Sequence, residues 1–179
     1  PIDNRLFYWP GGRDLETGTL PLDIVDANGN TQLDTHSING IMQMFYTSSY
    51  FLNNNLRQFV VSRSTFSGAG KYGGNTMGDV TSEFLNLRYS IENVLLFNSF
   101  AVPFTGADVC GFLGNASDIL CAKWYKAAAT VYPFARNHNN IGNLGQEPFV
   151  PEFTDFPLEE GRNITTLDVI RASMMVRYG

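Results

Sequence analysis

Residues 59–62 read FVVS, residues 67–78 read SGAGKYGGNTMG, residues 84–95 read FLNLRYSIENVL and residues 100–105 read FAVPFT. The first and last of these segments are short apolar runs, which predict buried strands. The glycine-rich segment predicts a loop, because glycine and turn residues interrupt regular structure. In residues 84–95 the apolar side chains recur at helical spacing, which predicts an amphipathic helix. The order strand, loop, helix, strand is one repeat of an α/β fold.

The same alternation extends in both directions along the chain. Helices are predicted at residues 36–56, 115–130 and 165–177, and short strands at residues 20–25 and 131–134. Repeated β-then-α units imply a parallel sheet, either open or closed into a barrel. A closed (β/α)8 TIM barrel takes roughly 250 residues and eight β-then-α units. This chain has too few residues and too few units to close a barrel. We therefore expect an α/β chain that is part of one barrel domain over residues 1–179, with no internal boundary.

The composition excludes several classes of protein. The chain has 179 residues, of which 44% are hydrophobic, and this composition is typical of a globular protein. Its net charge of −5 and scattered Lys and Arg residues make nucleic acid a poor candidate partner. The GKYGG run at residues 70–74 lacks the pattern of a phosphate-binding loop, which disfavours nucleotide binding. The longest apolar run, residues 94–104, is interrupted by polar residues and proline, so no membrane span is predicted.

The two cysteines, Cys110 and Cys121, have a spacing that does not suit a metal site, so no metal or other cofactor is expected. A disulfide and two reduced buried thiols are both compatible with the cysteine count alone. Asn115 and Asn163 each begin a glycosylation sequon, which favours the secretory route. The chain starts without Met and stops within a helix-like run, so we expect it to be a segment of a longer protein.

Polar side chains follow each of the predicted strands, where parallel α/β folds place their chemistry. Arg63 and Asp79 follow the first strand, Asp108 follows the second, and His138 follows the third. If these groups converge on one rim, they suit hydrogen bonding to sugar hydroxyls, with one carboxyl group protonating a leaving oxygen. Each also has a structural alternative. Asp79 could cap the following helix, Arg63 and Asp108 could form an ion pair, and His138 could be a core histidine.

Several longer motifs occur in one order over residues 57–149. They read VSRSTF at residues 61–66 with GD at 78–79, GADVCGFLGN at 106–115, YPFARNHN at 132–139 and QEP at 146–148. Together these motifs resemble the α-glucosidases of glycoside hydrolase family 31, and weaker matches extend the similarity over nearly the whole chain. The resemblance implies that the chain is roughly the C-terminal half of the catalytic (β/α)8 barrel of such an enzyme.

The family is a retaining one, in which one aspartate is the nucleophile and a second acts first as acid and then as base. The resemblance implies that Asp79 is the acid/base. It also implies that the pocket for the terminal glucose of an α-linked oligosaccharide is lined by Arg63, Asp108, Phe112 and His138. Cys110 and Cys121 match a family disulfide. The resemblance also implies a glycoprotein of the secretory route. Its expected location is the lysosome, the vacuole or the outside of the cell.

Two departures from the family pattern affect the functional prediction. The nucleophile lies in a W-x-D-M-N-E segment that does not occur here, so the rest of the parent barrel, in the same or a separate chain, is an expected partner. The family usually has His-Trp before the acid/base loop, where this chain has Asn75-Thr76. Loss of the indole removes a stacking surface for sugar. The alternative is therefore a non-catalytic relative, a pseudoenzyme with a structural or glycan-binding role.

Overall fold

The computed structural model describes residues 20–149 and 164–179. The chain divides into two compact units, residues 1–75 and residues 76–179, which are described separately below. The sheet contains parallel pairing and alternates with helices, as predicted for an α/β chain. Within the described ranges, none of the helices has the length and apolar character needed to cross a membrane.

The first unit begins with a turn and then becomes helical. Its helices are α2 (Gln32–Thr35), the 3-10 helix η1 (His36–Ile38) and α3 (Asn39–Asn53). They confirm the helix predicted at residues 36–56, with α2 as an addition. Thr31 caps α2 in a reciprocal capping box with Asp34, which satisfies backbone donors at the helix start.

The strand predicted at residues 20–25 was wrong. A single antiparallel bridge joins Val25 to Thr31, and the chain between them turns around Asp26. The Asp26 carboxylate accepts hydrogen bonds from the backbone N–H groups of Asn28 (2.8 Å) and Asn30 (3.0 Å). Asp and Asn side chains stabilise turns because they bond to backbone N–H groups that would otherwise pair with a neighbouring strand. The apolar run is therefore the arm of a tight turn.

A parallel strand pair follows α3. Strand β1 (Val61–Ser62) pairs with β2 (Gly74–Thr76), with Val61 opposite Gly74. The segment 67–78 was predicted to be entirely loop, which was wrong at β2 and at the 3-10 helix η2 (Ala69–Lys71). A Cβ atom at Gly73 would overlap the Val60 carbonyl. Glycine here therefore permits the close approach of the segments around residues 60 and 73.

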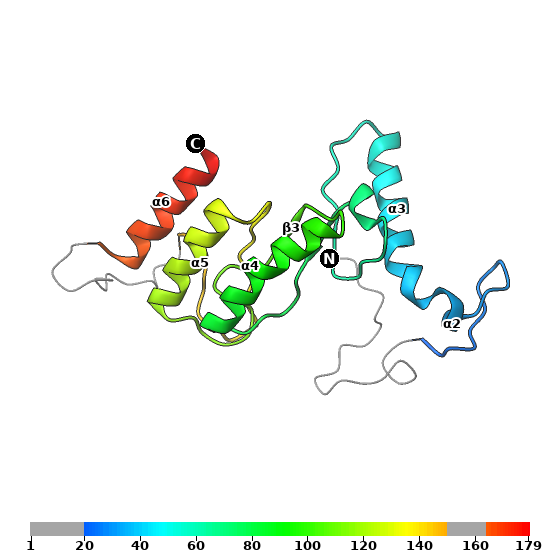
Figure 1. The fold of residues 1–179 in the computed structure, drawn as a ribbon, viewed down its shortest axis with the longest axis horizontal. Coiled ribbons are helices and arrows are strands. Elements are labelled where there is room, and N and C mark those ends of the chain that lie inside the picture. Colours follow the sequence, from blue (N-terminus) through cyan, green and yellow to red (C-terminus); the bar gives the residue numbers. More distant parts are fainter. Residues whose placement is uncertain (1–19, 150–163) are drawn as a thin grey trace. The chain divides into compact units, whose positions relative to one another are not determined.

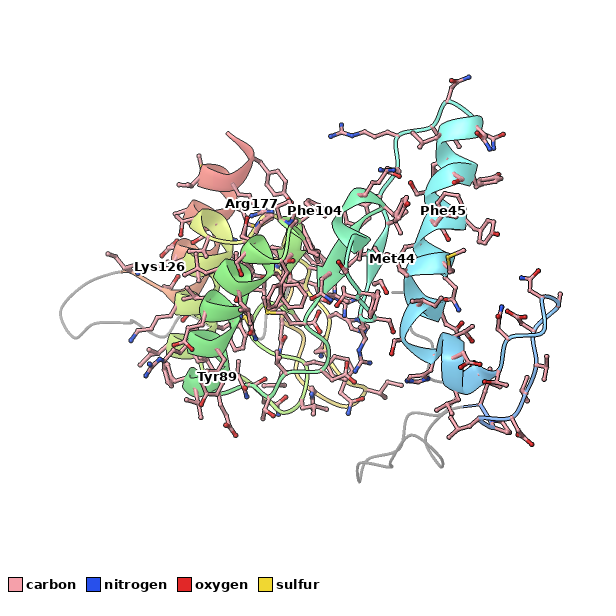
Figure 2. All side chains as sticks on the ribbon, turned by 45° about the vertical axis from the view of Figure 1, so that its right-hand side comes forward. Met44, Phe45, Tyr89, Phe104, Lys126 and Arg177 are labelled. Carbon is pink, nitrogen blue, oxygen red and sulfur yellow. A yellow bond between two sulfur atoms is a disulfide. The ribbon has the colours of Figure 1, made fainter. Side chains whose placement is uncertain are left out.

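Helix α3 packs against the segments around this strand pair through Met44, Ile41 and Phe51. Met44 is fully buried and forms a core cluster with Val60 and Ala69, against which Ile41 and Tyr72 also pack. Figure 2 labels Met44 beside its exposed neighbour Phe45 on α3. One face of the helix therefore supports the strand that leads to Arg63.

The described part of the second unit contains three long helices. They are α4 (Phe84–Ser99), α5 (Asp118–Thr130) and α6 (Thr166–Tyr178), which agree with the predicted helices in number and approximate position. Helices α5 and α6 lie side by side (Figure 1). Arg177 of α6, labelled in Figure 2, donates to the Ala128 carbonyl at 2.6 Å. A cation at the end of α5 satisfies carbonyl groups that have no partner within the helix.

The strands of the second unit are shorter than predicted. Strand β3 is Thr105–Gly106, and the chain after β2 pairs with it through the Met77 N–H and the Gly106 carbonyl (3.1 Å). Residues 100–104 are not a strand, because the N–H groups of Phe100, Ala101 and Val102 bond back to carbonyl groups at the end of α4. Residues 131–134 are not a strand either, and the parallel contact comes later, at Arg136 opposite Asp108. Both predicted runs contain a proline, which cannot donate to a ladder.

Cys110 and Cys121 are joined in a disulfide, which confirms that part of the prediction. Their Cα atoms are 4.6 Å apart, and both residues are fully buried in the core around Trp124. The bond links the segment after β3 to α5.

Replacing both cysteines by alanine is expected to lower the free energy of unfolding by about 3 kcal/mol, because a closed loop of this length restricts the unfolded chain. Urea denaturation followed by circular dichroism measures the change. A reducing agent should bring the unmutated chain to the same stability and leave the double variant unaffected. Equal denaturation midpoints for the two oxidised proteins would contradict this prediction.

Candidate active site

Asp79 lies on the loop that follows β2. Gly78 precedes it with a φ of 86°, a left-handed conformation that glycine adopts without strain. The following residues pair in parallel with the segment after β3, since the Val80 carbonyl accepts from the N–H groups of Phe112 (2.7 Å) and Leu113 (3.1 Å). These bonds hold the half-buried Asp79 next to the GADVCGF segment.

Asp79 is not the cap of helix α4. The N-cap position is occupied by Glu83, four residues later, and its side chain makes no capping hydrogen bond. The structural alternative considered for Asp79 is therefore wrong. The loop must hold its carboxyl group for another reason.

Asp108 is fully buried and forms an ion pair with Arg136. The Arg136 guanidinium donates to both carboxylate oxygens, through Nε to Oδ1 and through an Nη to Oδ2 at 3.3 Å. The backbone reinforces this contact, because the Val109 N–H donates to the Arg136 carbonyl at 2.9 Å. The ion pair that Asp108 makes within the second unit is thus with Arg136, which sequence reasoning had not assigned.

Burial raises the pKa of Asp108 above its ordinary value, since a charged carboxylate is poorly solvated in the core. The hydrogen bond and positive charge of Arg136 oppose this shift and lower the pKa, and His138 adds a weaker influence in the same direction. The nearby carboxyl group of Asp79 acts in the opposite direction and raises the pKa of Asp108. Asp79 and His138 are therefore each close enough to Asp108 to influence its pKa.

His138 stacks on Phe112. Their ring centroids are 5.1 Å apart and the ring planes differ by 28°. His138 is exposed and Phe112 is half-buried, so the alternative of a core histidine is wrong. The two rings form an amphipathic surface with an imidazole available for hydrogen bonding.

Arg63 lies in the first unit, where its backbone is held by a buried side chain. The Asn75 amide donates to the carbonyl groups of Ser62 (3.1 Å) and Arg63 (3.2 Å). The Asn75 Oδ1 and Thr76 Oγ1 atoms are buried and have no hydrogen-bond partner among the described residues. Asn75, which departs from the family pattern, thus supports the turn that carries Arg63.

The sequon asparagines fall in different parts of the chain. Asn115 is exposed just before α5, while Asn163 lies outside the described residues. Within the part of the chain that the structure describes, no cluster of three or more His, Cys, Asp or Glu residues could hold a metal ion.

Comparison with known proteins identifies the family of the chain. Residues 13–179 match the family described as glycosyl hydrolases family 31, TIM-barrel domain. The lysosomal alpha-glucosidase of Bos taurus is 41% identical over 79% of this chain. Glucoamylase 1 of Schwanniomyces occidentalis is 34% identical over 97% of it.

Solved structures agree with these relatives. The ER glucosidase II heterodimeric complex superposes with a TM-score of 0.77 at 30% identity, over 90% of this chain and 17% of that one. A family 31 alpha-glucosidase from Bacteroides thetaiotaomicron superposes with a TM-score of 0.66 at 29% identity, over 86% and 24% of the two chains. The chain spans only 15% of the bovine relative and 17% of the yeast glucoamylase. The chain belongs to glycosyl hydrolase family 31 and carries part of that family's TIM-barrel domain.

Proposed function

We propose that this chain is part of a retaining α-glucosidase that releases terminal α-linked glucose from oligosaccharides, with Asp79 as the acid/base. The observation that supports this most strongly is the placement of Asp79 on the loop after β2, within electrostatic reach of Asp108. A general acid must stay protonated beside an ionised nucleophile about 5 to 5.5 Å away. That nucleophile is proposed to lie in a segment outside this chain.

The remaining site residues are proposed to hold the glucose ring. Phe112 and His138 offer a stacked surface for the sugar, and His138 can exchange hydrogen bonds with a hydroxyl group. Asp108 is proposed to bind a sugar hydroxyl group through the hydrogen-bonding capacity that Arg136 leaves unused, which requires its fully buried carboxylate to become uncovered. Arg63, which Asn75 holds through its backbone, is proposed as a further sugar-binding residue.

The two compact units are proposed to belong to one barrel domain, completed by the rest of a longer protein. Its route is proposed to be secretory, ending in a lysosome or vacuole or outside the cell. A buried disulfide and an exposed sequon at Asn115 support this route, and one similar protein is a lysosomal alpha-glucosidase. Asn163 is a second proposed glycan acceptor.

A non-catalytic relative is the second candidate, and Asn75-Thr76 is the observation that favours it. Both side chains are buried, and neither provides the aromatic face that an indole would give to a sugar. In this case the barrel would bind glycans or support another subunit without cleaving a bond.

The two candidates differ in the reaction of the longer protein. With 4-nitrophenyl α-glucoside, the retaining enzyme is expected to release the α-anomer of glucose first, because two successive inversions restore the configuration. Proton NMR during the first minutes distinguishes it from the β-anomer. If the β-anomer appears first, the retaining mechanism is wrong. If no glucose is released, the non-catalytic candidate is favoured.

A further inference from the structure

Residues 137–146, called here the His138 loop, connect the Asp108–Arg136 pair to the QEP motif without any helix or strand. The side chain at its tip, Ile141, is 99% exposed and contributes no packing. A loop without ladder bonds or a buried apolar anchor depends on other contacts for its position. Apart from the stacking of His138 on Phe112, polar contacts must therefore position this loop.

The two ends of the His138 loop meet at one buried hydroxyl group. The Asn137 amide donates to the Tyr125 oxygen at 2.6 Å, and that hydroxyl donates to the Gln146 carbonyl at 2.7 Å. Asn137 also donates directly to the Gln146 carbonyl at 2.9 Å, which closes a triangle. Tyr125 is almost fully buried on α5, and burial raises the pKa of its phenol, so it stays protonated and able to donate.

The middle of the loop is attached to the segment after β3. The Phe112 carbonyl accepts from the Asn140 N–H (2.9 Å) and from the Asn143 amide (3.0 Å). Further along, the Leu144 N–H donates to Asn115 Oδ1 at 2.7 Å. Asn115 is the sequon asparagine just before α5, so its side chain serves the loop through Oδ1 and leaves Nδ2 as the atom to which a glycan would be attached.

We propose that Tyr125 and Asn115 are positioning residues that hold the His138 loop at two points and thereby place His138 on Phe112. The proposal rests on the proposed function, in which His138 contacts the glucose ring. Tyr125 holds the ends of the loop from the core, and Asn115 holds its far side from the surface. The role of Asn115 is separate from glycosylation.

Tyr125→Phe in the longer protein tests the buried contact, with Tyr132→Phe as the matched control. Tyr132 is the other buried tyrosine with a bonded hydroxyl, but its partners are Ser90 and Trp124 rather than the loop. Tyr125→Phe removes both hydrogen bonds of the hydroxyl and is expected to raise KM for an α-glucoside at least about fivefold, with a smaller change in kcat. Tyr132→Phe should lower the unfolding midpoint and leave KM unchanged. An equal increase in KM in the two variants would overturn the proposal.

If Tyr125→Phe does not fold, Asn137→Ser provides the same test. It removes the amide that bonds to Tyr125 and Gln146 and leaves the tyrosine in the core. The expected increase in KM is again several-fold. A KM and a loop exchange rate that both equal those of the unmutated protein would contradict the buried contact.

Three variants separate the loop contact of Asn115 from its glycan. Asn115→Asp keeps an oxygen acceptor for the Leu144 N–H, and Ser117→Asp keeps an oxygen that can cap α5, while both destroy the sequon. Asn115→Ala removes the sequon and the acceptor together. Asn115→Ala is expected to raise KM several-fold, while the two aspartate variants should match the unmutated protein. If Asn115→Ala and Asn115→Asp have the same KM and the same exchange rates in the loop, the contact does not position His138.

Hydrogen exchange separates failure of this proposal from failure of the proposed function. Amides of residues 138–145, measured by mass spectrometry, are expected to exchange faster in Tyr125→Phe and Asn115→Ala than in their controls. Unchanged exchange would show that the loop is not held at these points. Faster exchange with unchanged KM would mean that the loop is held as proposed but that His138 does not bind the sugar.

Discussion

Asp79→Asn in the longer protein is expected to reduce cleavage of oligosaccharides by about 10²- to 10⁴-fold in kcat/KM, the range contributed by a general acid. The amide cannot protonate the leaving oxygen. An aryl glucoside with an activated leaving group needs little protonation to depart, so formation of the covalent intermediate should be nearly unaffected. Steady-state kinetics on both substrates, together with the burst of released phenol, measures the contrast.

Glu83→Gln is the matched control for this variant. It removes a carboxyl group from the same segment, at an exposed position whose side chain makes no capping bond to α4. It should leave both substrates unaffected. If Asp79→Asn reduces activity on the two substrates equally, Asp79 is not the proton donor.

Arg136→Met is expected to destabilise the protein by about 3 to 5 kcal/mol, because it leaves the carboxylate of Asp108 buried without its partner. Asp108 is 0% exposed and Arg136 only 29%, so water can compensate little of the loss. Urea denaturation of the chain at neutral pH measures the difference. The double variant Asp108→Asn, Arg136→Met removes both charges and should recover most of the lost stability.

The loss in Arg136→Met should depend on pH. Burial raises the pKa of Asp108 in the folded state, so the folded protein favours the protonated form. Such a group lowers stability as the pH rises from the ordinary carboxyl value to the raised one. Without Arg136 the pKa rises further, so the variant should lose much less stability below about pH 4 than at pH 7. A loss that is independent of pH would show that the guanidinium contributes packing rather than charge.

The helices were largely predictable because their signals are local. The helix predicted at residues 165–177 is observed as Thr166–Tyr178, and its start is marked by a capping box between Thr165 and Asp168. Strand β2 could not be found in the same way. Its residues, Gly74, Asn75 and Thr76, are not apolar and do not alternate between apolar and polar. They form a strand only because the neighbouring strand β1 provides hydrogen-bond partners for their backbone groups.

The sequence by itself determined the α/β class, the approximate helices, the family and the candidate residues Arg63, Asp79, Asp108, Phe112 and His138. These follow from periodicity and from the identities of residues in motifs, which are written along the chain. Only the tertiary structure decided that Asp108 pairs with Arg136 and that Tyr125 joins the ends of the His138 loop. The physical reason is that burial decides which polar groups must pair, and burial depends on packing between segments far apart in the sequence.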